Sequence, residues 1–232
     1  ISVIDTHAHL AMLEHAPLSD ILDRATAAGI AKMVTVSVDE ASWKSNEAIA
    51  AKIPNVYFSL GLHPHEALHW KKLKPQFIPF FENSAVKEKC VALGEMGLDF
   101  YYNKSPKEDQ LEAFHDQIEI AKQLKLPIII HCRDSFDELY GILRKVGTPE
   151  RGGVMHCFTG NTSQAKEAID LGLMISFSGI VTFKNAKLLQ EAAKAIPENR
   201  IVIETDCPFL APVPHRGSPN EPSYILETLK CI

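Results

Sequence analysis

Histidines and carboxylates stand at or just past the ends of short apolar segments in this chain. The first two are His7 and His9, which follow the apolar run 2–4. Side chains two apart on a strand point to the same side, so these two imidazoles can meet at one point. Further residues follow their own apolar runs in the same way: Glu95, His131, His156 and Asp206. This repeated placement predicts a metal site of the kind found in metal-dependent hydrolases.

Four imidazoles and two carboxylates are too many ligands for one tetrahedral ion that must keep a position open. Two divalent ions roughly 3.5–4 Å apart, sharing a carboxylate and a water or hydroxide, would use the set economically. We expect Glu95 to bridge two groups: His7, His9 and Asp206 on one ion, and His131 and His156 on the other. The ions would lower the pKa of the shared water, and Asp206 would orient that water and take its proton. Imidazole favours Zn²⁺, Ni²⁺ or Co²⁺ and carboxylates also accept Mn²⁺ and Mg²⁺, so the identity of the metals stays open.

The apolar runs and the segments between them indicate a fold that would bring these residues together. Several runs are apolar on both faces, as the strands of a buried parallel sheet are, and segments with helical spacing lie between them. No glycine-rich phosphate loop follows an early run, which disfavours a nucleotide-binding sheet. We therefore expect a closed (β/α)8 TIM barrel with its active site at the carboxyl ends of the strands. The expected strands are 2–4, 32–38, 56–60, 91–93, 127–130, 153–155, 173–177 and 201–203, and the expected helices are 19–28, 109–124, 134–146, 162–171 and 186–195.

Length and composition limit the remaining possibilities. The 232 residues fit one large domain, and we expect a single domain over 1–232 and a monomer. No apolar run approaches the ~18 residues that a membrane span needs, and no signal peptide opens the chain. The five cysteines are odd in number and lack C-x-x-C pairing, which favours a reduced, cytoplasmic setting. A net charge of −5 argues against a generally basic nucleic-acid-binding surface, but two bound cations would reverse the potential at the site itself.

Two histidines follow the third expected strand and are candidates for contacting a substrate. They belong to Gly61-Leu62-His63-Pro64-His65, in which the proline breaks the regular geometry, so the two rings need not share a face. We expect His63, the nearer to the strand, to act as an acid or hydrogen-bond donor toward the leaving group, and His65 to contact the substrate.

Aromatic and cationic residues near the strand ends are further candidates. Tyr101 and Tyr102 follow Glu95 closely and could stack on unpaired bases, which is worth ~1–3 kcal/mol each, or pack under their loop. Arg133, two residues past His131, is a candidate phosphate contact, and Arg216 is a second.

Two cysteines and one carboxylate lie beside the expected ligands in the sequence. Cys132 and Cys157 each adjoin a histidine ligand and should point away from the metals as small packing residues. Glu204 lies two residues before Asp206 and either faces the site or is a paired structural carboxylate.

Taken together, these segments resemble the TatD family of metal-dependent deoxyribonucleases from one end of the chain to the other. The matching motifs are Asp5-Thr6-His7-Ala8-His9-Leu10, Gly61-Leu62-His63-Pro64-His65, Gly94-Glu95-Met96-Gly97-Leu98-Asp99, Pro127-Ile128-Ile129-Ile130-His131-Cys132-Arg133, His156-Cys157-Phe158-Thr159-Gly160, Glu204-Thr205-Asp206-Cys207-Pro208-Phe209-Leu210, and Arg216-Gly217 ahead of Asn220-Glu221-Pro222. The resemblance implies a TIM barrel, a two-metal site on the residues above and exonuclease action on DNA. Glu95 stands where many related amidohydrolases use a carboxylated lysine as the bridge.

Two departures from the family pattern matter. Ser218-Pro219 follow Arg216-Gly217 where the family usually has a basic residue, which puts a phosphate contact from that loop in doubt. The chain also stops before the family's last helical segments, so we expect the domain to lack the last C-terminal helical segment.

Three functions are compatible with this site. The first is a phosphodiesterase that trims DNA at single-stranded or frayed ends. The second keeps the metals but attacks a carbonyl, in an amide or in an ester such as an aminoacyl-tRNA. The third is a scaffold that binds metal or nucleic acid without turnover.

Overall fold

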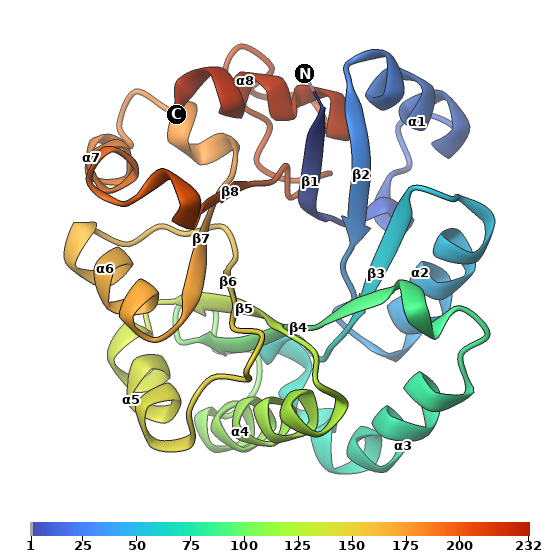
Figure 1. Cartoon of the computed structure of the whole chain (residues 1–232), viewed down its shortest axis with the longest axis vertical. Coiled ribbons are helices and arrows are strands. Elements are labelled where there is room, and N and C mark those ends of the chain that lie inside the picture. Colours follow the sequence, from blue (N-terminus) through green and yellow to red (C-terminus); the bar gives the residue numbers. More distant parts are fainter. Residues whose placement is uncertain (1) are drawn as a thin grey trace.

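Eight parallel strands form a ring with the helices outside it in the computed structural model, which describes residues 2–232 (Figure 1). Neighbouring strands pair in chain order, from β1–β2 to β7–β8. The ring closes between β1 and the segment after β8, where the backbone N–H of Asp206 donates to His7 O (2.9 Å) and that of His9 to Cys207 O (2.8 Å). The strands are β1 (Val3–Ala8), β2 (Ile30–Thr35), β3 (Val56–Leu60), β4 (Cys90–Asp99), β5 (Ile128–Arg133), β6 (Gly153–Met155), β7 (Leu173–Phe177) and β8 (Ile201–Ile203).

A helix follows every strand, so the expected (β/α)8 TIM barrel is confirmed. The helices are α1 (Leu18–Ala27), α2 (Glu40–Lys52), α3 (Trp70–Asn83), α4 (Lys107–Leu124), α5 (Phe136–Val146), α6 (Thr162–Asp170), α7 (Lys187–Ala195) and α8 (Ile225–Cys231). Within the described part of the chain, no helix combines the length and apolar character that a membrane crossing requires.

The apolar spacing did not predict α2 and α3. Two of the residues that α2 buries are polar, Ser42 and Asn46, so an apolar stripe of helical period is absent. Inside α3 stand Pro75 and Pro79, which usually end a helix. The face that α3 buries is nevertheless apolar and includes Trp70 and Phe77, whose rings lie 5.3 Å apart.

Strand β4 continues six residues beyond the expected end at Leu93, and this extension carries the middle of the site. Its glycines allow the close approach to β5. Gly97, with φ +143°, pairs with His131, and a Cβ at this position would overlap the carbonyl oxygen of His131. Because no residue with a side chain fits there, β4 can lie against β5 as far as Asp99.

Candidate metal centre

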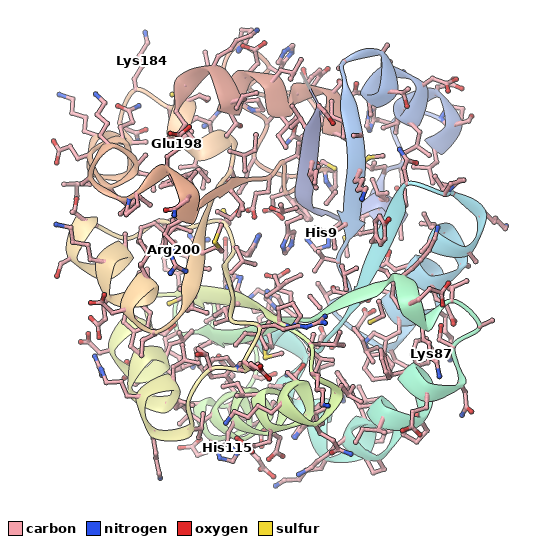
Figure 2. All side chains as sticks on the ribbon, viewed as in Figure 1. His9, Lys87, His115, Lys184, Glu198 and Arg200 are labelled. Atoms are coloured by element: carbon pink, nitrogen blue, oxygen red, sulfur yellow. The ribbon has the colours of Figure 1, made fainter. Side chains whose placement is uncertain are left out.

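The six side chains expected to bind metal converge at the carboxyl ends of the strands. They come from five different strands or the residues just after them, and His9 lies inside the ring in Figure 2. His7 lies within β1, Glu95 within β4 and His131 within β5, whereas His9, His156 and Asp206 follow β1, β6 and β8. The barrel therefore brings together residues that are up to about 200 positions apart.

One group of donor atoms surrounds a carboxylate oxygen of Glu95. Glu95 Oε2 lies 3.3 Å from His7 Nε2 and 3.8 Å from His9 Nε2. The two Nε2 atoms are 3.3 Å apart, and Asp206 Oδ1 lies 3.3 Å from that of His9. The donor atoms of His7, His9 and Glu95 lie within 4.8 Å of one another, as do those of His7, His156 and Asp206, so this side of the carboxylate could hold a cation.

The second group surrounds the other oxygen of the same carboxylate. Glu95 Oε1 lies 2.9 Å from His131 Nδ1 and 3.4 Å from His156 Nε2. The Glu95 side chain thus presents one oxygen to each group, as a bridging ligand would. The two groups also touch, because the His7 and His156 rings stack with centroids 3.6 Å apart.

His63, predicted to act as an acid or hydrogen-bond donor toward the leaving group, lies in this second group of donor atoms. Its Nε2 is 3.3 Å from Glu95 Oε1 and 3.4 Å from His131 Nδ1. The reason is local: His63 Nδ1 accepts the backbone N–H of His65 (3.1 Å), which turns the opposite ring nitrogen inward. Like Asp206 after β8, His63 stands three residues past the end of its strand, and this placement was the sequence signal for a position among the donor atoms.

Acceptors behind the ligands fix the orientation of two histidines. His9 Nδ1 lies 3.1 Å from Val36 O, and His131 Nε2 lies 3.1 Å from Asp99 Oδ2. Such contacts hold the tautomer that leaves the other nitrogen free for a metal. Behind a third histidine, Glu204 Oε1 lies 2.9 Å from His156 Nδ1, as an ion pair without hydrogen-bond geometry.

Glu204 is a buried, paired carboxylate, because it also accepts from Ser176 Oγ (2.5 Å) and from the backbone N–H of Cys157 (2.8 Å). Asp99 was not singled out from the sequence. Its spacing of four residues from Glu95 along one strand was the available signal, since it places both side chains on one face.

The charges at the site suit divalent cations. Burial alone would raise the pKa of Glu95, but the surrounding imidazoles of His156, His63 and His131 hold it well below the usual value. Burial lowers the pKa of His63 to about 4, which favours the neutral ring that can bind a metal. When the rings are neutral, as metal binding requires, the two buried carboxylates need positive charge to balance them, and the donor set of nitrogen and oxygen atoms fits two divalent cations.

The donor cluster forms the floor of an open cavity of about 550 Å³. Four of the expected substrate contacts line it: His63, His65, Tyr102 and Arg133. Tyr101 lies beneath Arg133, whose guanidinium carbon is 4.2 Å from the ring centroid. Arg216 is not part of the lining; its guanidinium carbon is 3.8 Å from the centroid of Phe183.

The sequence of this chain is similar to those of known proteins over almost its whole length. It is 41% identical over 224 residues to the uncharacterized metal-dependent hydrolase YabD of Bacillus subtilis, covering 96% of this chain and 87% of that protein. It is 33% identical over 218 residues to the 3'-5' ssDNA/RNA exonuclease TatD of Klebsiella pneumoniae, covering 92% and 82%.

A solved structure and a family model indicate the same family as these relatives. The crystal structure of YJJV, a TatD homologue from Escherichia coli, superposes with a TM-score of 0.87 at 28% identity, covering 99% of this chain and 88% of that one. Residues 4–232 match the model of the TatD related DNase family. The chain belongs to this family of metal-dependent hydrolases.

Proposed function

We propose that this protein is a two-metal phosphodiesterase that shortens DNA from unpaired ends. The observation that carries the proposal is the position of Glu95, which presents one carboxylate oxygen to each of two donor groups on the floor of an open cavity. Family membership and the exonuclease name of the Klebsiella relative support a nucleic-acid substrate.

Two divalent cations held by these groups would polarise the phosphate and supply an activated water. Asp206 lines the cavity, and hydrogen bonding to His9, together with the charges of His156 and His7, outweighs burial and lowers the pKa of its carboxyl group. The ionised carboxylate can therefore accept a proton from the attacking water.

His65 and Arg133 are placed to bind the substrate. His65 Nε2 donates to Asp99 Oδ2 over 2.8 Å, which fixes the ring in the cavity wall, where its other nitrogen can contact a substrate oxygen. Arg133 can bind a phosphate through its N–H groups.

The burial of the donor atoms supports a single-stranded substrate. His7 is 1% exposed and Glu95 3%, so a nucleotide must leave a duplex stack before its phosphate can reach them. All five cysteines are free, which supports a reducing, cytoplasmic setting. We further propose that the protein acts as a monomer with Mg²⁺, Mn²⁺, Zn²⁺, Ni²⁺ or Co²⁺ in the site.

The test uses end-labelled single-stranded and duplex DNA with Mg²⁺, with Mn²⁺ and with EDTA. The wild type should release mononucleotides stepwise from single strands, only with metal, and Glu95→Ala should abolish release. Glu119→Ala is the matched control, because it removes a carboxylate that pairs with Lys122 on the surface of α4. Absence of metal-dependent shortening by the wild type would contradict the proposal. Turnover of a p-nitrophenyl carboxylic ester but not of bis(p-nitrophenyl) phosphate would favour hydrolysis of a carbonyl substrate.

A further inference from the structure

The two opposite walls of the cavity differ in chemistry. Among its lining residues in the described chain, the lysine and arginine side chains are Lys104 and Arg133, from the loop after β4 and the end of β5. Met12, Phe209 and Leu210, from the loops after β1 and β8, also line it. Figure 1 shows β4 and β5 across the ring from β8 and β1. The donor cluster thus lies between a cationic wall and an apolar wall.

The cationic wall is a stack of aromatic rings and positive charges. The Arg133 guanidinium carbon is 4.2 Å from the Tyr101 centroid and 4.9 Å from that of Tyr102. Lys104 Nζ lies 5.9 Å from the Tyr102 centroid. Both tyrosines are exposed, Tyr101 by 58% and Tyr102 by 53%, so the loop does not bury them.

Arg133 is held by these rings and not by a carboxylate. Arg24 and Arg144 form ion pairs with Glu221 and Glu167, whereas no carboxylate within residues 2–232 lies within 4.0 Å of the Arg133 guanidinium. The rings restrict the plane of the guanidinium and leave N–H groups free. A planar, oriented guanidinium of this kind suits a phosphate.

The apolar wall suits one nucleobase and not a run of phosphates. Phe209 is 51% exposed, and its ring centroid is 6.0 Å from that of His9, so the aromatic face lies beside the donor cluster. Met12 extends this surface. The neighbouring part of the lining carries Asp39 and Glu66, after β2 and β3, whose negative charge repels a polyanion.

We propose that the two walls are nucleotide subsites on either side of the scissile phosphate. The terminal base stacks on Phe209, and the rest of the strand leaves over Tyr102, Lys104 and Arg133. This assignment rests on the proposed phosphodiesterase function and adds the position of each nucleotide. It requires an unpaired nucleotide on each side of the cleaved bond.

The test pairs side-chain variants with substrates that lack one base. Short single-stranded oligonucleotides carry either a normal or an abasic residue at the cleaved end. Phe209→Ala should lower kcat/KM about tenfold on the normal oligonucleotide, the size expected for one lost stacking contact, with no further loss on the abasic one. Phe209→Tyr, which keeps the aromatic face, should behave as the wild type. Arg133→Ala should raise KM on both oligonucleotides, and by an equal factor on the two, because Arg133 is proposed to contact a phosphate that both substrates carry.

The controls separate this proposal from the proposed function. Leu188→Ala and Arg144→Ala remove an exposed apolar side chain and a surface arginine from α7 and α5, and should change neither constant. Turnover of bis(p-nitrophenyl) phosphate by the wild type and by these two control variants reports on the centre itself. If Phe209→Ala acts equally on both oligonucleotides, or on neither, while this turnover persists, the subsite assignment is wrong. If the wild type lacks this turnover in metal, the phosphodiesterase proposal fails, and the subsites with it.

Discussion

Replacing Asp99 by Asn should weaken one metal site and spare the other. Asp99 Oδ2 accepts from His65 Nε2 (2.8 Å) and His131 Nε2 (3.1 Å), whereas Oδ1 accepts the backbone N–H groups of Tyr101 (3.1 Å) and Tyr102 (2.9 Å). The asparagine oxygen can keep the two backbone contacts. Its amide nitrogen takes the place of Oδ2 and cannot accept from the histidines.

The magnitude follows from the part that His131 has in the second donor group. Loss of an acceptor behind a metal-binding histidine costs about 10- to 100-fold in affinity, or about 1.4 to 2.7 kcal/mol. The first group contains His7, His9 and Asp206, none of which contacts Asp99 within hydrogen-bond distance in residues 2–232. We therefore expect one affinity to fall by this factor and the other to stay unchanged.

Calorimetric titration of the metal-free protein with Mn²⁺ separates the two affinities. Asp116→Asn is the matched control, because Asp116 Oδ2 accepts from Trp70 Nε1 (2.8 Å) and Lys74 Nζ (2.7 Å) away from the cavity. This control should lower the melting temperature and leave both affinities as in the wild type. An equal loss at both sites in Asp99→Asn, or none, would refute the reasoning.

Three further predictions follow from the same contacts. His63→Ala should lower the amount of Mn²⁺ bound per chain, because His63 Nε2 lies 3.3 Å from Glu95 Oε1. His65→Ala should leave this amount unchanged. Metal analysis after gel filtration measures both, and equal metal contents in the two variants would count against His63 as a ligand. Removal of metal with EDTA should lower the melting temperature, because the buried donors lose their counter-charge, and Mn²⁺ should restore it; identical melting curves would speak against a bound metal. The Arg24 hydrogen bond lowers the pKa of Glu221 to about 2, so the ionised carboxylate stabilises the fold above its unfolded pKa near 4.3, and the benefit is lost as pH falls toward 2. The difference in the free energy of unfolding between wild type and Glu221→Gln should therefore be full near neutral pH and narrow below about pH 5; a pH-independent difference would contradict this.

The sequence predicted the barrel because most of its strands and helices have the expected apolar periods. It failed where tertiary contacts replace those periods. Helix α2 buries Ser42 and Asn46, and each of these side chains has a hydrogen-bond partner in the segment before the helix. Asn46 Nδ2 donates to Ser37 Oγ (3.0 Å), and Ser42 Oγ accepts the backbone N–H of Val38 (2.9 Å). A buried polar side chain with such partners cannot be told from an exposed one by its type alone.

The candidate site could be predicted where the alternation of side chains along a strand sets the direction of a residue. This was enough to predict that the His7 and His9 side chains lie together, and their Nε2 atoms are 3.3 Å apart. It was not enough for His63, because a side-chain contact to the backbone of His65 sets its ring direction. Strand alternation also gives no direction for Arg216, which lies in the loop after β8 and contacts Phe183 in the loop after β7.

The most direct test of the two-metal account is anomalous diffraction from crystals grown with Mn²⁺. We predict two anomalous peaks, one on each side of the Glu95 carboxylate. One should lie among His7, His9 and Asp206, and the other beside His131. A single peak, or two peaks that do not both lie beside the Glu95 carboxylate, would contradict the account.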